Sequence, residues 1–306
     1  MIWKWLSFPL AAAGYDTVVC QFGGYHSWVP AFWKKILRKK LIIVLGGYDC
    51  VSFPAIGYGA FANKWMSKAI RYAYVRADLL LPVHESLMYE ENTYAPEHPT
   101  NQGIRAFLPN IKAKHQVIFN GYDPDKWHFN PTETPRKTII SVASGFEEKR
   151  RATLKGIDVL CDAALLLPEV DFILVGGQLD NLSPNVTCVP ETSQEELNRM
   201  FTRSGYIAQL SLSEGFPNAL SEAMLCGCVP IVSEVAAMPD IVGDFGFILK
   251  KRSVEDLVSL IQKLPVTPDR SDRVAIRNRI ASLFPEANRK HQLIQAISES
   301  SSQNHP

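Results

Sequence analysis

Two glutamates in the stretch SLSEGFPNALSEAM, Ser211–Met224, have a spacing that suggests chemistry. Seven residues separate Glu214 from Glu222, and Gly215 and Pro217 lie between them. Glycine lets a backbone turn tightly and approach a ligand closely, and proline suits the first position of a helix. The pattern therefore predicts a turn followed by a helix, with one carboxylate in each.

The predicted helix runs from about Pro217 to Leu225. Its first turn contains Asn218, Ala219 and Leu220. The N–H groups of such a helix start favour an anion, and Glu222 lies one turn further along the same face. A carboxylate there can accept hydrogen bonds from the hydroxyls of a ribose, and Glu214 can accept them from a second sugar. These features predict a site for a nucleoside diphosphate sugar, although the same residues also suit a helix start that binds nothing.

A second polar segment, Ser144–Asp158, follows an earlier apolar run. It is rich in cations, which with one residue just upstream are expected near one strand end: Lys137, Lys149, Arg150, Arg151 and Lys155. A lysine at position 155 would open the next helix and could reach the same phosphates. A solvated basic loop is the alternative. A strand that closes on glycines at Val175–Gly177 is a weaker third sign.

Apolar runs alternate with helical patterns along most of the chain. The runs are rich in Val, Ile and Leu and hardly alternate with polar residues, as strands buried on both faces do. The predicted strands are Thr17–Phe22, Leu41–Leu45, Leu79–Pro82, Gln116–Phe119, Thr138–Ala143, Phe172–Val175, Ile207–Leu212 and Val229–Val232. This alternation predicts an α/β fold with parallel sheets. Glu214 would then follow the carboxyl end of a strand, where ligands bind in open α/β sheets.

The polar stretch Gly121–Lys137 contains three prolines and is predicted to be a linker. A domain boundary is expected near residue 133. The predicted organisation is one domain at 1–132, a second at 133–284, a C-terminal helix at 285–298 and a disordered tail at 299–306.

The composition is that of an ordinary soluble globular protein. The chain has 306 residues, 46% of them hydrophobic, and a formal net charge of +1, which gives no global charge argument for nucleic acid. Its six cysteines are scattered, which favours reduced thiols in a cytosolic protein over a disulfide framework. No run approaches the ~20 apolar residues of a membrane span.

The stretch SLSEGFPNALSEAMLCGCVPIVS resembles the donor-site signature of the family 4 retaining glycosyltransferases, which have the GT-B fold. The match extends through LKGIDVLCDAALLLP, FILVGG and VIFNGYDPDKW and covers residues 75–250 well. The resemblance implies two Rossmann-like domains that face a cleft. Residues 1–132 would bind the acceptor and residues 133–284 the nucleotide sugar. It also implies transfer with retention at the anomeric carbon, with no metal and no cofactor besides the donor.

The resemblance assigns roles residue by residue. Glu214 matches the glutamate that contacts the donor sugar, and Lys155 matches the lysine that stabilises charge on the leaving diphosphate. These two are the predicted catalytic residues, and Glu222 matches the ribose glutamate. The whole predicted substrate-binding set is Arg150, Arg151, Lys155, Glu214, Gly215, Phe216, Pro217, Asn218, Ala219, Leu220 and Glu222.

The sequence departs from the family pattern in three places. Ser144 stands where an arginine usually follows the strand ending in VAS, and Arg150 or Arg151 is expected to substitute. The stretch GGYDC lacks the usual acceptor-side histidine, which leaves that role vacant or to Asp49. Two histidines also follow predicted strands: His26 and His84. The strand, glycine-rich loop and helix with which the family begins are missing, so the N-terminal domain is expected to be incomplete.

The segment Trp28–Lys40 carries five cations in seven positions beside two tryptophans. It fits an interfacial helix on an anionic membrane or a solvated helix between strands.

The prediction is a cytoplasmic glycosyltransferase, peripheral on the inner face of a membrane if this helix touches lipid. It would act on a glycan or lipid-linked glycan in surface polysaccharide or lipopolysaccharide synthesis, without a nucleic-acid partner. The alternative is a non-catalytic truncated remnant that still binds nucleotide through its second domain. A dinucleotide oxidoreductase is disfavoured because no G-x-G-x-x-G follows a first strand.

Overall fold

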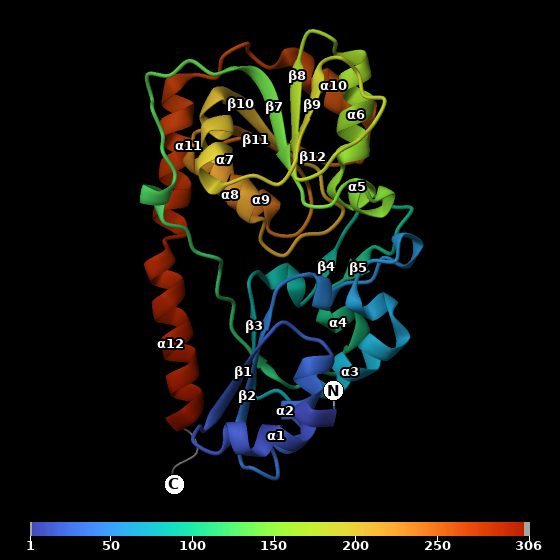
Figure 1. Cartoon of the computed structure of the whole chain (residues 1–306), viewed down its shortest axis with the longest axis vertical. Helices are drawn as coiled ribbons and strands as arrows, with labels where there is room; N and C mark the ends of the chain where they lie inside the picture. Colours follow the sequence, from blue (N-terminus) through green and yellow to red (C-terminus); the bar gives the residue numbers. More distant parts are fainter. Residues whose placement is uncertain (1, 303–306) are drawn as a thin grey trace. The chain divides into compact units, whose positions relative to one another are not determined.

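The structure is a computed structural model that describes residues 2–302 and the side chains of residues 7–300. The chain forms two compact units (Figure 1). The first unit consists of Met1–Glu91, His98–Asn120 and Ala287–Pro306, and the second of Asn92–Glu97 and Gly121–Glu286. Neither unit is a single continuous stretch of sequence. No helix in the described part of the chain is long and apolar enough to cross a membrane.

The first unit is built on a parallel four-stranded sheet of order β1-β2-β3-β6. Its strands are β1 (Thr17–Gln21), β2 (Lys40–Leu45), β3 (Leu79–Pro82) and β6 (Lys114–His115). The first three confirm the predicted strands. The predicted strand Gln116–Phe119 is displaced, because regular pairing ends at His115. Gln116 and Ile118 still donate their N–H groups to Leu80 O and Pro82 O of β3, at 3.0 Å each.

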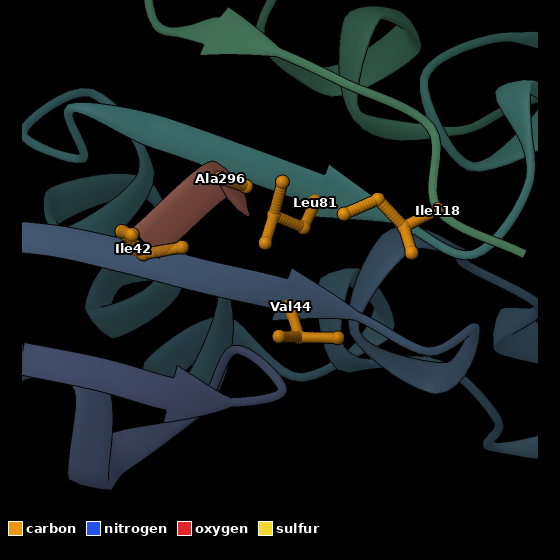
Figure 2. Packing of buried hydrophobic residues seen from close by; sticks show 5 residues of the cluster. All are labelled: Ile42, Val44, Leu81, Ile118 and Ala296. Carbon is orange, nitrogen blue, oxygen red and sulfur yellow. The ribbon is translucent and has the colours of Figure 1, made fainter. Parts of the chain in front are cut away.

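Both faces of this sheet are covered, which explains why β2 is an unbroken apolar run. One face carries α12 (Glu286–Ser302), where Ala296 packs with Ile42, Val44, Leu81 and Ile118 (Figure 2). Successive strand residues point to opposite faces. The alternate residues of β2 therefore face the other side, where α2 (Tyr25–Trp33) and α3 (Lys64–Tyr74) lie (Figure 1).

The remaining elements of the first unit are short. They are α1 (Ile2–Ala12), α4 (Ile104–Phe107) and the antiparallel pair β4 (Glu90–Glu91) and β5 (Asn101–Gln102). The buried Gln102 side chain ties this pair to the loop after β2. Its amide accepts from Ser52 N at 2.9 Å and donates to Ser52 O at 3.0 Å.

The second unit is a parallel six-stranded sheet of order β12-β11-β10-β7-β8-β9. Its strands are β7 (Arg136–Val142), β8 (Asp171–Val175), β9 (Val186–Val189), β10 (Ser204–Gln209), β11 (Val229–Ser233) and β12 (Phe247–Leu249). This is the doubly wound arrangement. From β7 the chain adds β8 and β9 on one side, and then returns to add β10, β11 and β12 on the other side, so the order reverses between β7 and β10. Ligands bind at such a switch point, beyond the carboxyl ends of the strands.

Helices cover both faces of this second sheet (Figure 1). The helices α6 and α10 pack together on one face, and α7, α8 and α11 lie on the other. Their bounds, with those of the two shorter helices, are α5 (Lys149–Lys155), α6 (Ile157–Leu166), α7 (Gln194–Arg203), α8 (Asn218–Leu225), α9 (Met238–Val242), α10 (Val254–Lys263) and α11 (Arg270–Leu283).

Several elements of the second unit differ from the sequence prediction. The strand expected at Ile207–Leu212 begins and ends earlier, as β10 (Ser204–Gln209), and beyond it Leu212 donates its N–H to Leu154 O. The strands β9 and β12 were not predicted, because both are short and partly exposed, and Thr187 interrupts the apolar residues of β9. The helix α5 lies within the polar segment Ser144–Asp158, so Lys155 ends this helix and does not open the next one, which begins at Ile157.

The predicted linker Gly121–Lys137 is an ordered part of the second unit. Arg277 of α11 donates to the carbonyls of Trp127 and Pro124 at 2.8 Å each, and Trp127 is buried. Tyr122 donates its N–H to Phe284 O at 2.8 Å. The compact units therefore divide at Gly121, upstream of the predicted boundary at residue 133. The proline-rich, polar residues from Gly121 to the start of β7 form an ordered segment, which we call the strap, that is bonded to the rest of the second unit.

Two predicted helical boundaries also differ. The helix α12 continues to Ser302, so residues 299–302 of the predicted disordered tail are helical, and residues 303–306 lie outside the described residues. The segment Trp28–Lys40 is not one helix. After α2 ends at Trp33 the chain forms turns in which Arg38 has a left-handed φ of 52°.

A buried carboxylate organises the loops at the carboxyl ends of β1 and β2. Asp49 is 1% exposed. It accepts hydrogen bonds from Gly23 N at 2.8 Å, Gly46 N at 3.1 Å, Gly47 N at 3.0 Å and the Tyr74 hydroxyl at 2.8 Å. One side chain thus satisfies donors from two loops and a helix, and buried donors must be satisfied.

We expect Asp49→Ala to lower the free energy of unfolding by roughly 4 kcal/mol, because it leaves several buried donors without an acceptor. Tyr74→Phe removes a single donor and should cost only about 1 kcal/mol. Urea unfolding monitored by circular dichroism measures both. Equal losses for the two variants would show that Asp49 does not act as the shared acceptor.

Candidate functional site

The structure brings Lys155 and Glu214 together at the switch point of the second sheet. Lys155 ends α5, and Glu214 follows β10. The Lys155 Nζ lies 2.6 Å from Glu214 Oε1, and the two side chains are 27% and 11% exposed. The same oxygen accepts from Gln209 Nε2 at 3.0 Å and from Ser211 Oγ at 2.7 Å. All three donors converge on Oε1, so Glu214 Oε2 has no partner among the described residues.

A close backbone approach places Lys155 at this position. Gly156 has a φ of 71°, and a Cβ added there would lie 2.4 Å from Leu210 O. Only glycine fits both the left-handed conformation and the contact. Because Gly156 rests on the exit of β10, the preceding lysine is held beside the turn that carries Glu214.

The backbone just before Glu214 is held from two sides. Leu212 donates its N–H to Leu154 O at 2.8 Å, and its carbonyl accepts from the buried Asn92 Nδ2 at 2.8 Å. Asn92 belongs to Asn92–Glu97, a short segment from the first half of the chain that is part of the second unit. Asn92 therefore helps to fix the turn that positions Glu214.

Sequence reasoning missed three residues that support Glu214: Asn92, Gln209 and Ser211. A signal for two of them was present. Gln209 and Ser211 are polar residues two positions apart in an otherwise apolar run, so they share one face. Nothing in the sequence near Asn92 indicates its partner, which lies 120 positions away.

Glu222 lies on α8 with its carboxylate unpaired. No hydrogen bond or ion pair joins this side chain to another of the described residues, and burial raises its pKa to about 7. The N-cap of α8 is Pro217, and no side chain caps this helix start. The Glu222 carboxylate can therefore accept hydrogen bonds from a ligand, and the backbone N–H groups at the start of α8 can donate them.

Three other predicted residues of this turn have side chains that are buried or bonded within the chain. Phe216 is buried between Tyr122 and Phe284, with ring centroids at 6.3 and 5.1 Å. Leu220 is fully buried, and Asn218 Oδ1 accepts from the Tyr122 hydroxyl at 3.0 Å. Side-chain contact of Phe216 or Leu220 with a ligand is therefore disfavoured. Tyr122 is a positioning residue that sequence reasoning missed.

Arg150 and Arg151 line a neighbouring hollow of about 750 Å³ beyond the carboxyl ends of β7, β8 and β9. Both guanidinium groups pair with Glu148, at 2.9 and 3.4 Å. The other lining residues are Ser144, Gly145, Glu147, Gly176, Gly177, Gln178, Pro190 and Glu191. Gly176, just after β8, lies so close to the end of β7 that a Cβ there would be 2.4 Å from Ala143 O. Only glycine therefore fits at this position in the lining of the hollow.

The expectation that Lys137 joins these cations is wrong. Lys137 lies near the start of β7, at the opposite edge of the sheet from Arg150 and Arg151, and donates to Leu264 O at 2.9 Å. In a parallel sheet all strands begin at one edge and end at the other. Lys137 lies near the start of β7 and the other cations follow its end, so the strand separates them.

The residues suggested for the acceptor side are engaged locally. Asp49 is buried in its loop network and is unsuited to meet a substrate. His26 Nε2 lies 3.1 Å from Gln21 O, and His84 Nδ1 lies 2.9 Å from Ser86 Oγ. Among the described residues, no group of three or more His, Cys, Asp or Glu side chains is arranged to hold a metal ion.

Comparison with protein families relates the second unit to known proteins. The family model "Glycosyl transferases group 1" matches residues 123–280, about half of the chain. A D-inositol 3-phosphate glycosyltransferase from Mycobacterium sp. (strain KMS) is 30% identical over 159 residues, which is 45% of this chain and 35% of that protein. The GDP-mannose:cellobiosyl-diphosphopolyprenol alpha-mannosyltransferase of Xanthomonas oryzae pv. oryzae (strain PXO99A) is 24% identical over 169 residues, 50% of this chain and 44% of that protein. The match thus spans less than half the length of either relative.

Solved structures extend the likeness over nearly the whole chain. The Anabaena protein Alr3699/HepE, solved in complex with UDP, superposes with a TM-score of 0.73 at 16% identity, covering 96% of this chain and 82% of that one. At this identity the likeness establishes the fold alone. That fold, GT-B, is the one the sequence resemblance implied, with parallel α/β sheets in both units.

The raised Glu222 pKa predicts a pH dependence of stability. Burial raises the pKa of Glu222 to about 7 from the ordinary value of 4.5, so the folded chain holds this proton more tightly than the unfolded chain does. The corresponding stability is present below about pH 4.5 and is lost as the pH rises through about 7. Glu222→Gln has no such proton. We expect its stability relative to wild type to rise by about 1–2 kcal/mol over this window, measured by urea unfolding. A difference that stays constant with pH would contradict the assignment.

Proposed function

This chain belongs to the group 1 glycosyl transferases, and from that premise we propose that it transfers a sugar from a nucleoside diphosphate sugar to a hydroxyl acceptor. Within that group we assign it to the retaining family 4 enzymes. The observation that carries the proposal is the Lys155–Glu214 pair beside the uncapped start of α8, with the unpaired Glu222 one turn further on.

Each group has a defined task in the proposed reaction. Glu222 accepts hydrogen bonds from the ribose hydroxyls, and the first turn of α8 faces the diphosphate. Lys155 exchanges part of its contact with Glu214 for the leaving phosphate, whose charge grows as the sugar–oxygen bond breaks. Glu214 then orients the donor sugar through its open Oε2. The acceptor hydroxyl forms the new bond on the same face of the sugar and gives its proton to the departing phosphate. No side chain of the chain is assigned as a nucleophile.

The hollow at Ser144 supplies the remaining donor contacts in this proposal. It lies along the carboxyl ends of β7, β8 and β9, and Pro190 and the two arginines are among its lining residues. We place the nucleotide base there, against the backbone that Gly145, Gly176 and Gly177 leave open. Arg150 and Arg151 take the role of the arginine that family members usually have at the position of Ser144. The acceptor-side catalytic residue is left unassigned.

The acceptor is proposed to be a glycan or a lipid-linked glycan. The name of the Xanthomonas relative specifies a diphosphopolyprenol-linked acceptor, and the name of the mycobacterial relative specifies inositol 3-phosphate. Both names describe phosphorylated acceptors. A role in surface polysaccharide or lipopolysaccharide synthesis follows as part of the proposal, with the chain in the cytoplasm and in peripheral contact with the inner face of a membrane.

The first test is nucleotide binding. A thermal-shift panel of UDP, GDP, ADP and their sugar conjugates should reveal one base that stabilises the folded chain. At ~100 times its dissociation constant a ligand adds about 2.7 kcal/mol. Glu222→Ala should abolish most of that shift. Glu169→Ala is a matched control, because Glu169 is exposed and lies before β8, at the other edge of the sheet. Binding without sugar transfer to any acceptor would favour the non-catalytic alternative, and no shift with any nucleotide would refute the donor site.

A second test separates the phosphate role from nucleoside recognition. Lys155→Ala should weaken nucleoside diphosphate binding at least tenfold and leave nucleoside binding almost unchanged, because a charge-assisted hydrogen bond is lost only with phosphate present. Isothermal titration calorimetry measures both affinities. Lys137→Ala, which removes a lysine at the opposite edge, serves as the control. Equal losses for diphosphate and nucleoside would exclude a phosphate contact for Lys155.

A further inference from the structure

The first unit carries a dense group of cations at one edge of its sheet. Two adjacent hollows, of about 920 and 570 Å³, share Lys40 and Asp78. Eight cationic side chains line them: Lys34, Lys35, Arg38, Lys39, Lys40, Arg76, Lys112 and Lys114. Three acidic ones lie among them: Asp16, Asp78 and Glu299. We call this surface the basic edge.

The tertiary fold assembles the basic edge from distant parts of the sequence. Lys40 begins β2 and Lys114 begins β6, so the surface lies at the amino ends of the strands. The register pairs Thr17 with Lys40 and Leu79 with Lys114. The loops that hold Asp49 follow the carboxyl ends, at the opposite edge of the same sheet.

Few of these charges are neutralised by the other residues that the structure describes. Lys34 pairs with Asp78 at 2.6 Å, and Arg76 stacks over Tyr72 at 3.6 Å. The remaining cations form no ion pair with any other described residue. They are Lys35, Arg38, Lys39, Lys40, Lys112 and Lys114. The chain as a whole has a net charge of only +1. The excess of cationic over acidic side chains at the basic edge is therefore a local feature of this surface.

Apolar side chains are exposed beside the cations. Ile36 is 62% exposed and Phe32 is 38% exposed, and both line the larger hollow. Trp28, also 38% exposed, contacts Tyr72 on the same surface with ring centroids 5.9 Å apart. Cations interleaved with exposed apolar and aromatic side chains suit the headgroup region of an anionic bilayer. A soluble polyanion would not require the apolar part.

We propose that the basic edge binds the surface of an anionic membrane. The cations would lie among lipid phosphates while Phe32 and Ile36 enter the interface. The loops at the carboxyl ends of the strands of this sheet would stay free of the lipid. The proposal deepens the proposed function by naming the partner that would hold the enzyme near a lipid-linked acceptor, but membrane binding itself requires no donor, acceptor or catalysis.

The test is co-sedimentation of the full chain with vesicles at about 0.1 M salt, where electrostatic contacts are effective over ~10 Å. Wild type should bind vesicles that contain about one third phosphatidylglycerol and should not bind pure phosphatidylcholine. The variant Lys35→Gln/Lys112→Gln/Lys114→Gln should lose about a hundredfold in partitioning, from about fivefold per lysine. Ile36→Ser should lose severalfold, because it removes an inserted apolar group.

A matched control removes the same charge elsewhere. The variant Lys250→Gln/Lys251→Gln/Lys263→Gln changes three exposed lysines of the second unit and should bind vesicles as wild type does. Lys112→Gln/Lys114→Gln alone should also weaken binding, which a surface limited to Trp28–Lys40 does not predict. All of the variants change exposed residues, and thermal melting checks that each one folds.

Several outcomes would overturn the proposal. One is no vesicle binding by wild type, and another is equal losses for the triple variant and its control. Tighter binding of wild type to a DNA duplex than to the vesicles, at the same salt, would instead identify a nucleic-acid surface. Because nucleotide thermal shifts are measured without lipid, failure here leaves the donor-site result intact, and failure there leaves this one intact.

Discussion

The hydrogen bonding of one partly buried carboxylate, Glu214, by three converging donors is the interaction on which the proposed donor site depends. Its Oε1 accepts from Lys155, Gln209 and Ser211, which come from α5, β10 and the chain beyond β10. These groups meet only because the winding of the sheet switches between β7 and β10. The contact of Gly156 with the exit of β10 then fixes Lys155. The fold therefore supplies the position, and the charge-assisted hydrogen bonds supply the rigidity.

Three carboxylates in this chain illustrate how environment decides the role of a residue type. Asp49 is buried with donors around it and has nothing left to offer a ligand. Glu222 has no partner among the described residues, and burial raises its pKa to about 7. Glu214 lies between these limits, with one oxygen saturated and the other open. The number of donors around each group separates a structural carboxylate from one available for binding.

The edges of the first sheet carry different kinds of loops, which follows from its parallel strands. All carboxyl ends lie at one edge and all amino ends at the other. The buried Asp49 network occupies the first, and the basic edge occupies the second. An almost neutral chain can therefore hold a strongly charged surface, because its balancing acids are placed elsewhere. Net charge alone says nothing about such a surface.

The sequence by itself determined the α/β class, most of the buried strands and the residues of the donor turn. Those features are local: a strand buried on both faces must be a continuous apolar run, and Gly215, Pro217 and Glu222 lie within one turn and the helix that follows. Lys155 could be linked to them only as one of several cations expected near a strand end, and then through the family resemblance. The chain itself joins this lysine to Glu214 through a contact across 59 positions.

Only the tertiary structure decided which polar residues act together. Asn92 reaches Leu212 across 120 positions, Lys137 falls at the wrong edge of the sheet, and the strap after Gly121 docks where a free linker was expected. The basic edge likewise joins Lys35 to Lys112 and Lys114. The physical reason is the same in each case. Hydrogen bonds and charges act over a few ångströms in space, while sequence patterns report only neighbours within a few turns of the chain.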